Sequence, residues 1–255
     1  MKIKVGVPFA KHGRITDETL NSLKELGKCT DFEVEVVAQQ GSNVPRARNA
    51  MINGEKSNLV QQTLTDFDYF LCVDADTGFT VEHVKQLLAH DENIVSGAYV
   101  HKHDASRIVA GWFKEIEGVS RMEDRVDLDA TGLIEVDWVG AGFMLLKRKA
   151  LEAMPYPWFS CDEIQYNSDK GPCAQVVSDD LGFCIKARKN GQKIMLDADC
   201  RVDHVHHPNE HGGTLSDALN DLLRNRETII RHVKAMGEEN QKLKQMLGQQ
   251  AEKKD

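Results

Sequence analysis

Short runs of apolar and β-branched residues alternate with amphipathic segments along the first hundred residues of the chain. The apolar runs predict strands at residues 2–7, 32–38, 69–73 and 93–99. The amphipathic segments predict helices at residues 16–26, 46–64 and 80–90, with Thr80 as the N-cap of the last. This βαβαβαβ order predicts an α/β fold, Rossmann-like, with a mostly parallel mixed sheet flanked by helices.

The pattern is less regular after residue 101 and resumes near residue 142. Residues 108–113 favour a hairpin strand, and residues 142–147 predict a strand that is followed by a short helix through Ala153. We expect a loop at residues 155–172, a helix at 179–189 and a strand at 193–196. Gly191 suits the position just after the helix, because glycine readily adopts the left-handed conformation found there.

The C-terminal part of the chain has a different rhythm, with spacings of four and three residues. Such a heptad pattern predicts a long C-terminal helix, and Asn240 at a core position is typical of a two-stranded coiled coil. Arg226 at another core position and Gly237 within the helix weaken this repeat. We therefore divide the chain into a body, residues 1–213, and a helix, residues 214–255, that either joins copies into a homo-oligomer or packs on its own body.

Composition restricts the class of protein. The 255 residues are 41% hydrophobic and 28% charged, with a formal net charge of −8. The longest stretch without strongly polar side chains is residues 139–146, whereas a membrane-spanning helix needs about 20 apolar residues. The first residues also lack the apolar stretch of a signal peptide. We expect a cytoplasmic protein with no membrane partner, six reduced cysteines and little affinity for the phosphate backbone of nucleic acids.

The strongest local signal is an apolar strand that ends in two carboxylates, Asp74 and Asp76. Where a strand ends, both side chains can reach a shared divalent cation that also binds phosphates. In sheets of this class ligands bind at the carboxyl ends of the strands, where Pro8, Gln39 and Gln40 also fall. A D-x-D at a strand end is also common as simple turn chemistry.

A haloacid-dehalogenase-like phosphatase is one alternative interpretation. Such enzymes also begin from an apolar strand and D-x-D, and Asp179 and Asp180 could imitate their later acidic motif. They place Thr or Val four residues after the first Asp, where this chain has Gly78. Two βα units also precede the motif here, which disfavours this alternative.

Six short motifs follow one another along the chain: Val5-Gly6-Val7-Pro8-Phe9, Ala47-Arg48-Asn49, Val73-Asp74-Ala75-Asp76, Val139-Gly140-Ala141-Gly142-Phe143-Met144-Leu145, Asp179-Asp180-Leu181-Gly182-Phe183-Cys184 and Val202-Asp203-His204. In order and approximate spacing they resemble the motifs of glycosyltransferases of the GT-A fold. The resemblance is to family 2 and its short phage and bacterial forms, and it extends over residues 3–207.

The resemblance implies a metal-dependent glycosyltransferase that moves a sugar from a nucleotide-diphosphate donor to a hydroxyl acceptor. Asp74, Asp76 and His204 would hold Mn²⁺ or Mg²⁺, with His206 as an alternative ligand. Asp180 would be the catalytic base, with Asp179 as its stand-in, and inversion of configuration is favoured over retention. The implied donor contacts are Pro8, Phe9, Gln40, Arg48, Asn49, Asp74, Trp138, Gly140, Ala141 and Gly142.

Several features stay open at this point. Gln39 and Gln40 stand where the family commonly has acidic residues that read uracil, so a UDP-sugar is favoured but the donor base is not decided. The small residues 140–142 would let a sugar lie against the backbone, and Trp138 either stacks on a sugar ring or fills the core. The acceptor is a small molecule, a glycan, a protein or a modified DNA base. A noncatalytic coiled-coil assembly protein with a degenerate transferase body is the rival interpretation.

Overall fold

The computed structural model describes residues 1–9, 15–41, 43–54, 64–101, 104–116, 119–168 and 171–204. They belong to one compact unit, Met1–Val205. The proposed metal ligand His206 and the predicted helix at residues 214–255 lie outside the described residues, so the predicted division at residue 213 stays a prediction.

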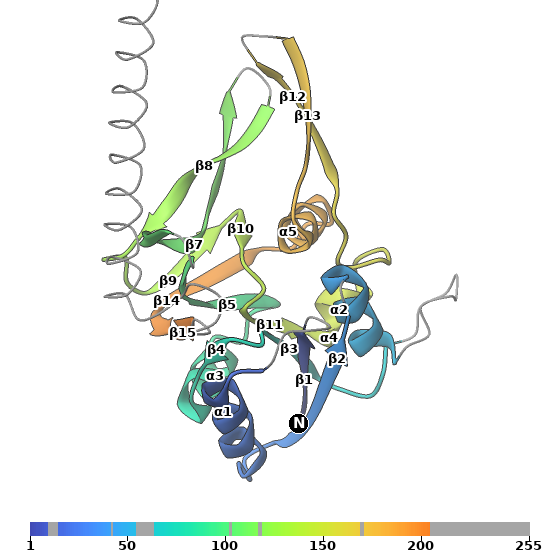
Figure 1. Ribbon diagram of the computed structural model, residues 1–255, viewed down its shortest axis with the longest axis vertical. Helices are drawn as coiled ribbons and strands as arrows, with labels where there is room; N and C mark the ends of the chain where they lie inside the picture. The colour runs from blue at the N-terminus through green and yellow to red at the C-terminus, as the bar shows by residue number, and fades with distance from the viewer. Residues whose placement is uncertain are drawn as a thin grey trace, which may run out of the picture. The chain divides into compact units, whose positions relative to one another are not determined.

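A seven-stranded mixed sheet forms the centre of this unit, in the order β2-β1-β3-β11-β5-β14-β9 (Figure 1). Strands β2, β1, β3, β5 and β14 run in one direction, and β11 and β9 run against them. The predicted mostly parallel mixed sheet is therefore confirmed. The strands of this sheet are β1 Lys2–Phe9, β2 Glu33–Gln40, β3 Tyr69–Val73, β5 Ile94–Ala98, β9 Leu133–Val136, β11 Phe143–Lys147 and β14 Ile194–Arg201.

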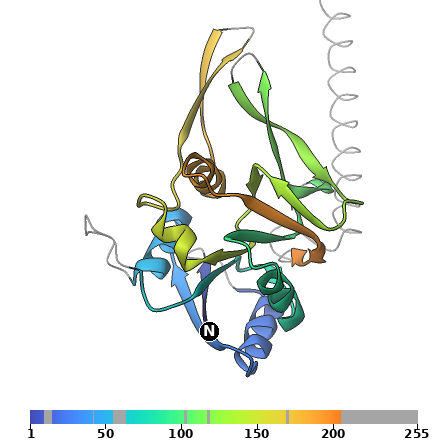
Figure 2. The same ribbon diagram turned by 180° about the vertical axis from the view of Figure 1, so that it is seen from behind.

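Helices cover both faces of the sheet, as Figures 1 and 2 show. They are α1 Asp17–Gly27, α2 Val44–Asn53, α3 Val81–Ala89, α4 Arg148–Glu152 and α5 Asp179–Lys189. Successive residues of a strand point to opposite faces. In β3, accordingly, Leu71 and Val73 pack in the apolar cluster with α1 and α3, whereas Phe70 and Cys72 pack in the cluster with α2, α4 and α5.

Local capping sets the helix ends. Thr16 and Thr80 accept backbone N–H groups at the starts of α1 and α3, and Thr80 forms a reciprocal capping box with His83, which confirms Thr80 as an N-cap. The predicted helix at residues 46–64 is too long. Helix α2 ends at Asn53 because Gly54 adopts a left-handed conformation, with φ 70°, that terminates a helix.

Two hairpins extend from the same side of the sheet (Figure 1). One joins β7 Asp104–Ile116 to β8 Val119–Asp127, and the other joins β12 Glu163–Ser168 to β13 Gly171–Val176. The expected loop at residues 155–172 is thus wrong in its second half. Its Ile, Gln and Tyr residues pair across an antiparallel ladder that only the facing strand supplies.

The remaining short strands connect the sheet to the segments around its carboxyl edge. They are β4 Thr77–Gly78, β6 Val100–His101, β10 Trp138–Val139 and β15 Asp203–His204. Strand β15 pairs with β4 in antiparallel register, so that His204 lies opposite Thr77. This ladder brings the end of the described chain next to the turn that follows β3. Within the described residues, no helix combines the length and apolar character needed to cross a membrane.

Candidate functional site

The D-x-D turn leaves β3 at its carboxyl end and is held by three backbone hydrogen bonds. Asp74 N donates to Gly142 O at 3.0 Å, Thr77 N donates to Asp74 O at 3.2 Å, and Thr16 N at the start of α1 donates to Ala75 O at 2.8 Å. The two carboxylates have different partners, Arg48 for Asp74 and His204 for Asp76. The turn therefore presents two acidic groups in two different environments.

Arg48 joins the first carboxylate to helix α5. Its Nη2 donates to Asp74 Oδ1 at 2.7 Å and its Nη1 donates to Asp179 Oδ2 at 2.5 Å. Only 6% of the Arg48 side chain is exposed. Burial lowers the pKa of Arg48, but Asp74 and Asp179 outweigh burial and hold that pKa above its ordinary value. The guanidinium therefore stays charged and ties the D-x-D turn to the start of α5.

His204 faces the second carboxylate. Its Nδ1 lies 3.0 Å from Val100 O, and its Nε2 lies 3.3 Å from Asp76 Oδ1. Because a carbonyl only accepts hydrogen bonds, Nδ1 carries the proton, and Nε2 of the neutral ring then carries a lone pair toward the carboxylate. Two acceptors that face each other need a proton or a cation between them. A backbone carbonyl that accepts the distal ring N–H is also the usual arrangement of a metal-binding histidine.

This donor set fits a hard divalent cation. Carboxylate oxygens suit both Mn²⁺ and Mg²⁺, whereas an imidazole nitrogen suits a transition-metal ion such as Mn²⁺ better than Mg²⁺, and Asp76 and His204 are both mostly buried. Among the described residues, however, no three His, Cys, Asp or Glu side chains already converge on one point. The second oxygen of Asp74, water or phosphate oxygens of a ligand would complete the coordination.

The two acidic residues at the start of α5 have different roles. Asp179 is buried and bound to Arg48. Asp180 is partly exposed, and its Oδ1 accepts from Leu181 N at 2.9 Å and from the Ser178 hydroxyl. Asp179 is thus engaged with the guanidinium, and its expected role as stand-in base stays a prediction.

The two glycines of residues 140–142 lie against Tyr99. A Cβ on Gly140 would lie 2.0 Å from the Tyr99 hydroxyl, and a Cβ on Gly142 would lie 2.8 Å from the Tyr99 ring and 3.2 Å from Asp74 Oδ2. The small residues, with Ala141 buried between them, thus let Tyr99 and Asp74 approach the backbone. The expected contact of residues 140–142 with a sugar stays a prediction.

Sequence reasoning missed Tyr99. It closes the predicted strand at residues 93–99, at the same sheet edge as Asp74, so the rule that ligands bind at this edge could have found it. Its hydroxyl accepts from Gly142 N at 2.9 Å. Burial raises the pKa of Tyr99 well above its ordinary value, and the carboxylates of Asp74 and Asp180 raise it further. The phenol therefore remains protonated.

Two expected donor contacts are instead part of the interior. Trp138 is 4% exposed and packs in the core between β7 and α5, because β10 pairs with β7 at Gly111. The core alternative for Trp138 is therefore the one that the structure matches. Asn49 is also buried, and its amide binds the loop before β12: Oδ1 accepts from Trp158 N and Phe159 N, and Nδ2 donates to Phe159 O.

The remaining expected contacts lie at the carboxyl edge of β1 and β2. Phe9 pairs with Gln40 across these parallel strands, and Pro8 pairs with the residue before Gln40. Strand β1 also pairs with β3, which leads to Asp74. Sheet order therefore places the three expected base contacts and the D-x-D on neighbouring strand ends, as we predicted from the positions at which the strands end.

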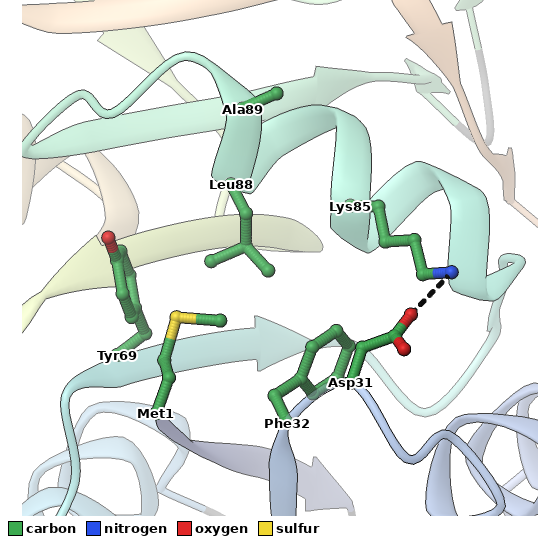
Figure 3. A pocket seen from close by; sticks show the side chains of 7 residues that line it. All are labelled: Met1, Asp31, Phe32, Tyr69, Lys85, Leu88 and Ala89. Carbon is green, nitrogen blue, oxygen red and sulfur yellow. Dashed lines mark ion pairs between the residues drawn. The ribbon is translucent and has the colours of Figure 1, made fainter.

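An open pocket of about 350 Å³ lies at the opposite end of these strands, and Figure 3 shows the side chains that line it. Met1, Phe32, Tyr69 and Leu88 line it, and an ion pair between Lys85 and Asp31 closes one side. Because Met1 and Tyr69 stand at the amino ends of β1 and β3, this pocket does not belong to the D-x-D site.

No protein-family model matches this chain. No curated protein matches it either. Among solved structures, it is similar to a viral protein from STIV, with a TM-score of 0.43, 16% identity, and coverage of 81% of this chain and 97% of that one. It is also similar to a Drosophila β-1,4-galactosyltransferase 7 mutant in complex with manganese, UDP-Gal and xylobiose, with a TM-score of 0.43, 14% identity, and coverage of 82% and 72%.

Proposed function

We propose that this chain is a metal-dependent glycosyltransferase that transfers a sugar from a nucleotide-diphosphate donor to a hydroxyl acceptor. One observation carries the proposal. Asp74 and Asp76 after β3, His204 in β15 and Asp180 at the start of α5 come from three distant segments and gather around the carboxyl edge of one sheet. This is the edge at which open α/β sheets bind nucleotides.

Asp76 and His204 are the proposed ligands of Mn²⁺ or Mg²⁺, and the second oxygen of Asp74 is the proposed third ligand. A bound divalent cation would supply Lewis-acid stabilisation of the diphosphate that leaves the sugar. The protein's own contribution is to hold the ligands. Val100 O fixes the His204 ring by accepting its Nδ1–H, and Arg48 fixes Asp74.

Asp180 is the proposed general base. An acceptor hydroxyl becomes a good nucleophile when a positioned carboxylate removes its proton. Asp180 is partly exposed and uses Oδ1 for its hydrogen bonds to Ser178 and Leu181, so Oδ2 is the oxygen proposed to receive the proton. Direct displacement with inversion is the preferred course. Asp179 holds Arg48 in this scheme.

The nucleotide base would bind at the ends of β1 and β2, where Pro8, Phe9 and Gln40 lie. A side-chain amide can both donate and accept, so Gln40 can pair with the edge of a pyrimidine such as uracil. A UDP-sugar is therefore the favoured donor. The acceptor is proposed as a hydroxyl compound. The two hairpins that extend from the sheet are the proposed surface for binding it.

The experiment is calorimetric titration with UDP, GDP, CDP and TDP, each with and without Mn²⁺. We expect one diphosphate to bind only with the metal, and Asp76→Ala to abolish that binding. Asp66→Ala is the matched control, because Asp66 is an acidic side chain that is 97% exposed and lies at the amino end of β3. If no diphosphate binds under any condition, the transferase proposal fails and the assembly-protein interpretation gains.

A further inference from the structure

Tyr99 connects to Asp74 through the backbone of a single residue, Gly142. The Tyr99 hydroxyl accepts from Gly142 N at 2.9 Å, and the carbonyl of the same Gly142 accepts from Asp74 N at 3.0 Å. The hydroxyl therefore fixes the backbone that orients the first carboxylate of the D-x-D turn. Because Tyr99 is buried, water does not replace this hydrogen bond when it is lost.

Tyr99 also contacts the other half of the site. Its ring meets the His204 ring edge to face, with centroids 5.3 Å apart and planes at 78°. The carbonyl of the next residue, Val100, accepts from His204 Nδ1. Two consecutive residues after β5 thus hold the imidazole, one through its ring and one through its N–H, with Nε2 turned toward Asp76.

The packing around Tyr99 leaves it one position. The hydroxyl would lie 2.0 Å from a Cβ on Gly140, and the ring would lie 2.8 Å from a Cβ on Gly142. Such close approach to two glycines means that the ring cannot shift toward the turn, and a buried, packed side chain has few alternative rotamers. Tyr99 is therefore a rigid reference point between Asp74 and His204.

We propose that Tyr99 is a positioning residue for the metal and diphosphate site, which sets Asp74 through its hydroxyl and His204 through its ring. This inference rests on the proposed function. Groups that orient a metal ligand typically change metal affinity by about 10- to 100-fold when they are removed. The hydroxyl and the ring act on different ligands, so separate substitutions distinguish the two contributions.

The test measures Mn²⁺ affinity by electron paramagnetic resonance and diphosphate affinity by calorimetry, well below the melting temperature of each variant. Tyr99→Phe keeps the ring and removes the hydroxyl, and we expect it to weaken diphosphate binding about tenfold and to weaken Mn²⁺ binding less than Tyr99→Leu does, because His204 keeps its ring contact. Tyr99→Leu removes both contacts and is expected to weaken Mn²⁺ binding about tenfold as well. Tyr69→Phe is the matched control, because Tyr69 lies in the pocket at the opposite end of β3 (Figure 3).

A double-mutant cycle separates positioning from general destabilisation. If the Tyr99 ring acts on the metal through His204, then Tyr99→Leu and Tyr99→Phe should differ in Mn²⁺ affinity by less than about twofold in a His204→Gln background. The inference is overturned if wild type binds metal and diphosphate and both Tyr99 variants bind within about twofold of it, even with lowered melting temperatures. Should Tyr99→Leu not fold, Tyr99→Phe decides the question through diphosphate affinity. Absence of binding by wild type would instead refute the proposed function.

Discussion

Replacement of Arg48 by Met is the perturbation that most directly tests how the site is held together. Methionine fills much of the same volume but carries no charge, so Asp74 and Asp179 lose the guanidinium that both contact. Arg46→Met is the matched control, because Arg46 lies two residues earlier in the same helix and is exposed. Arg48→Lys keeps the charge but lacks the planar fork that reaches two carboxylates, and we expect an intermediate loss.

The expected magnitude follows from burial. Removal of one partner from a buried ion pair costs about 3–5 kcal/mol, because the other charge stays buried without compensation. The Asp179 side chain is 13% exposed, whereas the Asp74 side chain is 32% exposed and is stabilised by water. Asp179 therefore accounts for most of the cost, and we expect the free energy of unfolding to fall by about 3 kcal/mol, near the lower end of that range. With an m value of about 2 kcal/mol/M, the urea midpoint falls by about 1.5 M.

Urea unfolding monitored by circular dichroism at several pH values measures this loss. The raised pKa of Arg48 means that its contribution is present at every pH below the ordinary arginine pKa and is lost only as pH rises through the still higher folded value. Arginine therefore does not titrate in the measured range. This account of the ion pairs is refuted if Arg48→Met lowers the free energy of unfolding by less than about 1 kcal/mol, or by no more than Arg46→Met does.

Two further predictions concern packing and thiol chemistry. Gly140→Ala should destabilise the protein by about 1–3 kcal/mol in the same unfolding assay, because its Cβ would lie 2.0 Å from the Tyr99 hydroxyl. Gly27→Ala, where a Cβ meets nothing within 4 Å, should not destabilise it, and an equal effect of both would contradict the packing argument. Iodoacetamide at about pH 8 should label exposed Cys161 well before three buried cysteines, because burial raises the pKa of each of those thiols to about 12. Peptide mass spectrometry measures the labelling. Equal labelling of all four cysteines would contradict the burial of the three. These three are Cys72, Cys184 and Cys200.

Much of the fold was predictable because it follows from local patterns. Strand β3 and helix α5 have the predicted bounds, since an apolar run and the start and stop signals of a helix are each complete within a few residues. For α5 these signals are the acidic residues of its first turn and Gly191 after its end. The end of α2 was missed because apolar and helix-favouring residues continue after it, although Gly54 supplies the stop signal. Strand β12 was missed because a hairpin strand depends on its partner across the ladder.

The candidate site, like the fold, was predictable from the sequence only in part. Position along the sequence was enough to bring Pro8, Gln40 and Asp74 to one sheet edge, because parallel strands end on the same side. The partners of the charged groups were not predictable from spacing. Arg48 and Asp179 are 131 residues apart, and their contact depends on where α2 and α5 pack around the sheet.

The sequence by itself thus determined the order of strands and helices, the carboxyl-edge location of the D-x-D and the residue types available for chemistry. Tertiary structure alone decided that Asp179 anchors Arg48, that His204 meets Asp76 through the pairing of β15 with β4, and that Tyr99 fills the space beside Gly142. The physical reason is the separation along the chain of the residues that interact. Hydrophobic periodicity and capping act over a few residues, whereas ion pairs and close packing are set by elements that meet only after the chain has folded.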